Sequence, residues 1–135
     1  MAISRRLKFR IGLTIIMLSV FLWVLNESLD KNQDACLLLH QDRLVLVAKQ
    51  LLENPSDQVY FNDRDPEFPS YLLKFGAVGV GRGQRWPGAV RVTRRTGFTF
   101  SGFFIVVTPE LFAQRNIPSS MRLRKVNDHI YIWID

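Results

Sequence analysis

The sequence predicts an α+β protein: an N-terminal membrane helix, then one amphipathic helix packed on an antiparallel sheet of four or five strands. Three observations lead to this fold class. Residues 11–25 are apolar and uncharged, no glycine or proline occurs from Leu13 to Asn54, and the pattern after Tyr71 becomes that of short strands. The 135 residues are enough for one anchor and one small domain.

The apolar segment reads IGLTIIMLSVFLWVL and follows four basic residues at positions 5, 6, 8 and 10. Basic residues before a span and acidic residues after it predict a cytoplasmic N-terminus. We therefore expect a basic cytoplasmic tail at 1–10, a lipid-contacting transmembrane anchor at 11–26, and an extracytoplasmic α+β domain at 27–135.

The length of this apolar segment leaves an alternative open. Fifteen helical residues rise only about 22 Å, against a bilayer core of about 30 Å, so Lys8 and Arg10 would have to snorkel. A segment of this length is also typical of a cleaved signal peptide, but no small-x-small cleavage site follows it. An uncleaved anchor is therefore the favoured interpretation.

A second helix is predicted within Cys36–Glu53, where apolar residues recur at helical spacing. Asp34 suits the N-cap position if this helix is separate, and otherwise one helix of about forty residues continues from the membrane. Pro55 ends the helix in either case. Its apolar stripe is expected to pack on the sheet.

Apolar and alternating segments predict the strands. They lie at Leu72–Val80, Ala89–Arg95, Phe98–Thr108, Met121–Val126 and His129–Ile134, with a further brief strand at Val59–Phe61 as an option. The run Phe103–Val107 is apolar on both faces, which predicts a central, covered strand. Thr96-Gly97 and Asn127-Asp128 are expected to be hairpin turns, and Thr108 is expected to cap a short helix at Pro109–Arg115.

The net charge of +6 is divided unevenly along the chain. Residues 27–67 carry nine acids and four bases, whereas residues 68–135 carry ten bases and three acids. Strand alternation puts several of these bases and two aromatics on polar strand faces. They are Arg91, Arg95, Arg122, Arg124, Tyr131 and Trp133.

If the strands are neighbours, these side chains form one Arg-rich face with aromatics between. Arginine binds carboxylate and phosphate groups by bidentate contacts, so such a face predicts an acidic protein or an anionic lipid as partner. Nucleic acid is disfavoured because the domain is expected outside the cytoplasm. The alternative is a solvated sheet face in which arginines stack on Tyr and Trp.

Two loops resemble ligand sites but lack required parts. Glycines occur at positions 76, 79, 81 and 83, yet a phosphate loop needs a helix directly after its glycines, and turn-forming residues follow here. Asp63, Asp65 and Glu67 alternate as in a calcium loop, but the turn glycine and the downstream glutamate are missing. Neither loop is expected to hold a nucleotide or a metal.

The single cysteine, Cys36, lies four positions before His40, which would give half a metal site with His129 as the one further histidine. One cysteine excludes a disulfide within these residues and leaves a bond between two copies open. No acid on the same helix face orients the pair for nucleophilic catalysis. The sequence therefore predicts no catalytic residue, no cofactor and no metal site.

Residues 5–18 read RRLKFRIGLTIIML and resemble the start of a type IV prepilin or pseudopilin, where a basic leader ends in glycine before an apolar helix. The matching positions are Gly12, Leu13, Thr14 and Ile15. A long helix followed by a loop and an antiparallel sheet is also similar to that family's layout. The chain has Met17 where the family usually carries a glutamate, so no functional residue is transferred.

Together these patterns predict a single-pass, membrane-anchored binding or scaffolding module without catalytic activity. The alternative, implied by the resemblance, is a pilin-like or pseudopilin-like assembly subunit whose leader is cleaved after Gly12. An oligomer is compatible with both functions.

Overall fold

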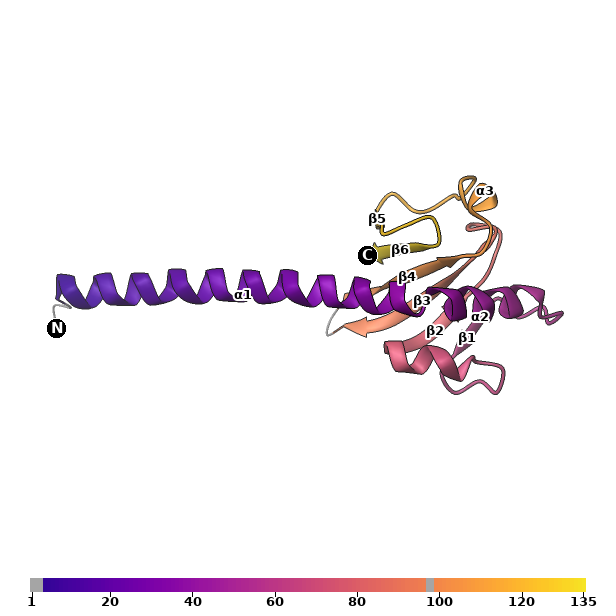
Figure 1. Cartoon of the computed structure of the whole chain (residues 1–135), viewed down its shortest axis with the longest axis horizontal. Coiled ribbons are helices and arrows are strands. Elements are labelled where there is room, and N and C mark those ends of the chain that lie inside the picture. The colour runs from indigo at the N-terminus through magenta and orange to yellow at the C-terminus, as the bar shows by residue number, and fades with distance from the viewer. Residues whose placement is uncertain (1–3, 97–98) are drawn as a thin grey trace. The chain divides into compact units, whose positions relative to one another are not determined.

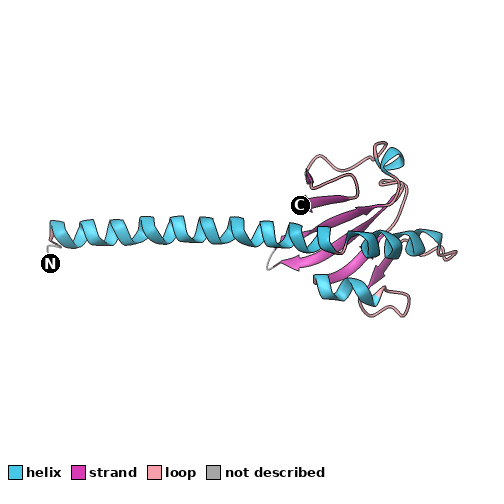
Figure 2. Ribbon diagram, in the orientation of Figure 1, coloured by secondary structure: helices cyan, strands magenta, loops and turns pink. Residues whose placement is uncertain are grey.

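A computed structural model describes residues 4–96 and 99–135 (Figure 1). The chain divides into two compact units, Met1–Leu37 and Leu38–Asp135. The described residues form a long helix, a shorter helix, and six strands with two short helices between them (Figure 2). The predicted α+β class and the antiparallel sheet are confirmed. The predicted turn at Thr96-Gly97 lies partly outside the described residues.

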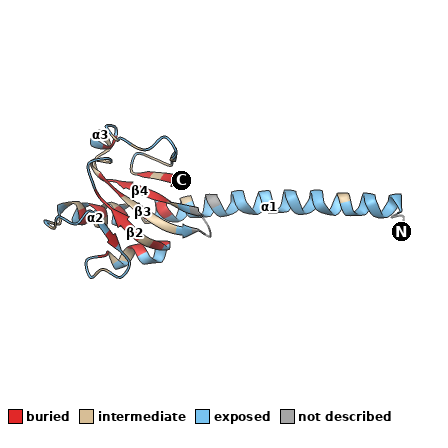
Figure 3. Ribbon diagram, turned by 180° about the vertical axis from the view of Figure 1, so that it is seen from behind, coloured by how far each residue is buried: buried red, intermediate tan, exposed pale blue. Residues whose placement is uncertain are grey.

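Helix α1 spans Arg5–Leu39, which corresponds to roughly 52 Å at the helical rise. Ser4 acts as its N-cap, because its hydroxyl accepts a hydrogen bond from the Leu7 N–H at 3.2 Å. The absence of proline after this cap lets the helix continue unbroken. Exposed residues follow one another along nearly the whole helix (Figure 3).

Helix α2 spans Gln41–Glu53, so the helical region divides at His40. Of the two alternatives left open, the helices are separate, but Asp34 lies inside α1 and is not the N-cap of the second helix. The His40 ring, at the break, contacts residues of the following domain. Its Nδ1 lies 3.1 Å from the Tyr71 hydroxyl, and its edge contacts Tyr71 and Phe75. These contacts come from residues distant in sequence, which local helix signals do not report.

The sheet has the strand order β1-β2-β3-β4-β6-β5, and every neighbouring pair is antiparallel. The strands are β1 (Tyr60–Asn62), β2 (Ala77–Gly81), β3 (Ala89–Thr96), β4 (Thr99–Val106), β5 (Arg122–Lys125) and β6 (Ile130–Ile134). Six strands replace the expected four or five, because the brief segment near residue 60 pairs with β2 as an edge. Strand β4 is central, as its apolar run predicted.

The strand predicted at Leu72–Val80 is wrong in its first half. Ser70–Phe75 forms a 3-10 helix, η1, whose buried residues Leu72 and Phe75 are three positions apart, the period of that helix. Gly76 ends it in the left-handed conformation with φ 77°, which glycine adopts without steric cost. Strand β2 begins only after this glycine.

The domain buries apolar side chains on both faces of the sheet. Helix α2 contacts β3 and β4 and buries Leu44, Ala48 and Leu51, which follow helical spacing. The opposite face carries a second core around β4, β6 and the short helix α3 (Pro109–Phe112). Its buried members are Ala89, Phe104, Val106, Phe112 and Trp133. Strand β4 is therefore covered on both sides.

Candidate functional site

Helix α1 contains a stretch of 18 residues that is long and apolar enough to cross a membrane, and none of this stretch is buried. Two polar side chains within the apolar segment bond back to the helix. Thr14 Oγ1 donates to the Arg10 carbonyl and Ser19 Oγ to the Ile15 carbonyl, both at 2.9 Å. Such bonds satisfy hydroxyl groups where no water is present. The segment therefore has the physical properties of a span.

The predicted Arg-rich face is divided by the sheet register. Arg91 lies opposite Phe104, which lies opposite Tyr131, so Arg91 and Tyr131 share a face. By strand alternation Arg95 and Trp133 lie on that face too.

Strand β5 places its arginines on the other side of the sheet. Arg122 pairs with Ile134 and Arg124 with Ile132, and these isoleucines alternate with Tyr131 and Trp133. The expectation that all six residues share one face is therefore wrong. Alternation assigns faces within a strand, but the β5–β6 hairpin register decides which face of β5 meets which face of β6.

The two aromatic residues of the predicted face belong to the second core. Trp133 is completely buried, and its indole N–H donates to the Val92 carbonyl at 3.0 Å. Tyr131 is half-buried, with its ring centre 5.0 Å from that of Phe112. Neither ring is an open platform on which a partner stacks.

Arginines lie over the faces of these rings. The Arg91 guanidinium lies 4.1 Å from the Trp133 ring centre and 5.6 Å from that of Trp86. Burial lowers the pKa of Arg91, and the charges of Asp135 and Tyr60 partly oppose that shift. Arg115 covers Tyr131 at 5.4 Å. Sequence reasoning missed Trp86 and Arg115, because both lie outside the strands whose alternation it used.

Side chains of the acidic loop and of His129 form contacts within the domain. The Asp65 carboxylate accepts from the Asn62 N–H at 2.8 Å, and Glu67 accepts from the Asn54 amide at 3.3 Å. His129 Nδ1 lies 2.6 Å from the Val106 carbonyl. Among residues 4–96 and 99–135, no group of three or more His, Cys, Asp or Glu side chains is arranged to hold a metal.

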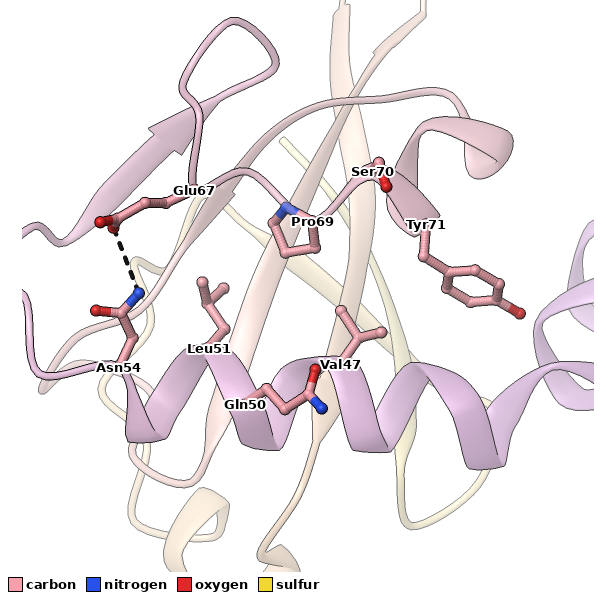
Figure 4. A pocket seen from close by; sticks show the side chains of 8 residues that line it. All are labelled: Val47, Gln50, Leu51, Asn54, Glu67, Pro69, Ser70 and Tyr71. Carbon is pink, nitrogen blue, oxygen red and sulfur yellow. Dashed lines mark hydrogen bonds between the residues drawn. The ribbon is translucent and has the colours of Figure 1, made fainter.

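A pocket of about 320 Å³ lies between α2 and the segment that leads into η1 (Figure 4). Helix α2 and its C-cap contribute Val47, Gln50, Leu51 and Asn54, and the facing segment contributes Glu67, Pro69, Ser70 and Tyr71. Glu67 and Asn54 meet at one end, whereas the Tyr71 ring points away from them at the other. Glu67 supplies the carboxylate among the residues that line the pocket.

No protein-family model, curated protein or solved structure matches the chain. Its function is therefore inferred from its own residues. Among the bases on the described strands, the exposed ones are Arg95 on β3 and Arg122, Arg124 and Lys125 on β5. Three of the four residues of β5 are basic, and β5 is an edge strand of the sheet. This edge is the candidate contact surface.

Proposed function

We propose that this chain is a single-pass, membrane-anchored module that binds a partner without catalysis. The observation that carries the proposal is the apolar stretch of α1, none of which is buried. Exposed apolar surface costs about 25 cal/mol per Å² in water, and a lipid core removes that cost. Residues 11–26 are the anchor in this proposal, residues 1–10 a cytoplasmic tail, and residues 27–135 an extracytoplasmic domain.

The binding part of the proposal rests on the exposed bases of the domain. Arg95, Arg122 and Arg124 are exposed, whereas Arg91 is half-buried against tryptophan. Exposed arginines favour carboxylate and phosphate groups, so the partner class is an acidic protein or an anionic lipid.

The natural cysteine tests the orientation of the anchor. Cys36 is exposed, is the only cysteine, and follows the proposed span by ten positions. We expect a membrane-impermeant maleimide to label Cys36 in right-side-out vesicles of the host without detergent, because the domain is proposed to lie outside the cytoplasm. The protein should also stay in the membrane pellet after extraction at alkaline pH.

The matched control moves the thiol to the opposite side. A Cys36→Ser, Ser4→Cys variant should label only after the vesicles are lysed, because Ser4 belongs to the cytoplasmic tail. Release of the wild-type chain by alkaline extraction would refute the anchor. Labelling of Cys36 only after lysis would reverse the proposed orientation.

A second candidate function is a pilin-like or pseudopilin-like assembly subunit. It is favoured by one observation, the 35-residue helix α1 followed by an antiparallel sheet. On this function the chain recovered from host membranes should lack residues 1–12, and intact mass spectrometry measures that directly. For the uncleaved anchor we expect the full-length mass of the wild-type chain. The Gly12→Leu variant should then also be recovered at full length. A mass lacking residues 1–12 that Gly12→Leu restores to full length would make the assembly subunit the leading function.

A further inference from the structure

The two edges of the sheet differ in how their main-chain groups are satisfied. In an antiparallel ladder, alternate residues direct their main-chain groups toward the neighbour and away from it. Arg82 N donates to Val59 O at 2.8 Å, and Asp63 N donates to Val78 O at 3.1 Å. Residues 59, 61 and 63 therefore bond to β2, and the main-chain groups of Tyr60 and Asn62 face outward.

Side chains close this outer edge of β1. The Gln58 amide donates to the Tyr60 carbonyl at 2.9 Å. The Asp65 carboxylate accepts from the Asn62 N–H at 2.8 Å. An incoming strand would have to break both bonds before it could pair with β1. Such covering is one of the ways in which proteins block an edge strand.

The edge at β5 is open by the same criterion. Val126 N donates to Ile130 O at 3.0 Å, which sets the phase of the β5–β6 ladder. Arg122 and Arg124 then direct their main-chain groups toward β6, with partners Ile134 and Ile132. The main-chain groups of Leu123 and Lys125 face away from β6, and no other described residue bonds to them.

The basic side chains of β5 limit which kind of strand can pair with its outer edge. Three of the four side chains are basic, and Lys125 forms an exposed ion pair with Asp128 at 2.9 Å. Exposed pairs of this kind contribute roughly 0–1 kcal/mol, so another carboxylate can replace it. A second copy's β5 would place bases opposite bases, and its β1 is closed. The complementary occupant is an acidic strand from another protein.

We propose that β5 binds an extended acidic peptide segment of a partner protein as a seventh, antiparallel strand of the sheet. The inference rests on the proposed binding function and names its partner class and its mode of contact. Main-chain bonds to Leu123 and Lys125 give affinity, and carboxylates opposite Arg122, Arg124 and Lys125 give selectivity. Read from its N-terminus, the matching segment is acid, acid, β-branched residue, acid.

A fluorescent peptide of sequence TEEVET tests the proposal by anisotropy with the full-length chain in detergent micelles. We expect saturable binding that Lys125→Pro weakens about tenfold or more, because proline removes the outward N–H and the charge and adds a ring at the interface. Lys125→Gln removes the same charge but keeps the N–H, and we expect only a two- to fivefold loss, on the order of one exposed charge pair.

Each outcome of this experiment either supports strand addition at β5 or overturns it. The Lys125 N–H faces away from β6, so Lys125→Pro should retain the near-ultraviolet spectrum of the folded domain. If Lys125→Pro fails to fold, a TEEVET peptide N-methylated at its valine takes its place, because it lacks the N–H that would donate to the Leu123 carbonyl and keeps every charge, so undiminished binding of this peptide would overturn strand addition. An equal loss for the proline and glutamine variants would overturn strand addition in favour of charge attraction alone.

Absence of peptide binding would mean that the bases only protect the edge from self-association, and would overturn the proposal. Retention on anionic vesicles by Lys125→Pro, without peptide binding by the wild-type chain, would assign the bases to lipid. The assay uses solubilised protein, so its result is independent of membrane orientation, which Cys36 labelling measures separately.

Discussion

Truncation of Trp133 to alanine is expected to lower the free energy of unfolding of the domain by about 3–5 kcal/mol, the range for a fully buried tryptophan. Trp133 is completely buried in the second core, beside Phe104 and Phe112. Its removal leaves a cavity and also leaves the Val92 carbonyl without its indole donor. A loss of this size is comparable to the whole stability of many small domains.

Guanidinium denaturation of the full-length chain in detergent, followed by near-ultraviolet circular dichroism, measures this loss. Trp133→Phe keeps a ring but lacks the indole N–H, so it should lie between wild type and Trp133→Ala. Gly102→Ala should be destabilising as well, because an added Cβ would lie 1.8 Å from the Val92 carbonyl oxygen and 2.8 Å from Trp133 Nε1, so it disturbs the β3 backbone together with the indole contact. Gly83→Ala is the matched control, with its nearest neighbour at an ordinary 3.5 Å. Losses below about 1 kcal/mol for both Trp133 variants would contradict this account.

The role of Trp133 also changes how variants of Arg91 are interpreted. The Arg91 guanidinium lies 4.1 Å from the Trp133 ring centre, and its Nε is buried without a hydrogen-bond partner among the described residues. Its substitution by glutamate would place a carboxylate against the face of an indole ring. A loss of binding in such a variant would therefore report on packing. Arg122, which is exposed on β5, is the better residue for testing charge.

The sequence was most informative where the pattern is local. The alternation of Val90 and Val92 predicted β3, and the run Phe103–Val107 predicted the central strand β4. It failed at Leu72–Phe75, where apolar residues three apart fit a 3-10 turn as well as a strand. In each case the deciding quantity was the period of the apolar residues over a few positions.

The candidate site depended on pairings that no local pattern encodes. The residues of β5 and β6 were correctly placed in strands, but the relative register of the hairpin separates Arg122 from Tyr131. At the break between α1 and α2, His40 contacts Tyr71, which is thirty-one positions later in the chain. Tertiary contacts of this kind override helix and strand preferences, so they become visible only in the folded chain.

Arg82 carries the second large effect, and we expect Arg82→Met to destabilise the domain by about 3 kcal/mol. This side chain is only 8% exposed. Its Nε donates to Gln58 O at 2.9 Å and its Nη1 to Asn54 O at 2.8 Å. The guanidinium also donates to the carbonyls of Leu51 and Ser56. A single cation thus bonds four carbonyls at and beyond the C-terminal end of α2, where the helix dipole favours positive charge.

The expected loss corresponds to a decrease in Tm of roughly 12–24 °C for a domain of about 100 residues. Methionine fills similar space but has no donor, so the buried carbonyls lose their partners. Arg82→Lys should be intermediate, because one ammonium cannot reach all four carbonyls with the geometry of a planar fork. Arg85→Met, at an exposed position three residues later, is the matched control and should change Tm little. If Arg82→Met behaved like this control, water would be replacing the guanidinium, and the link from α2 to β2 would contribute little to stability.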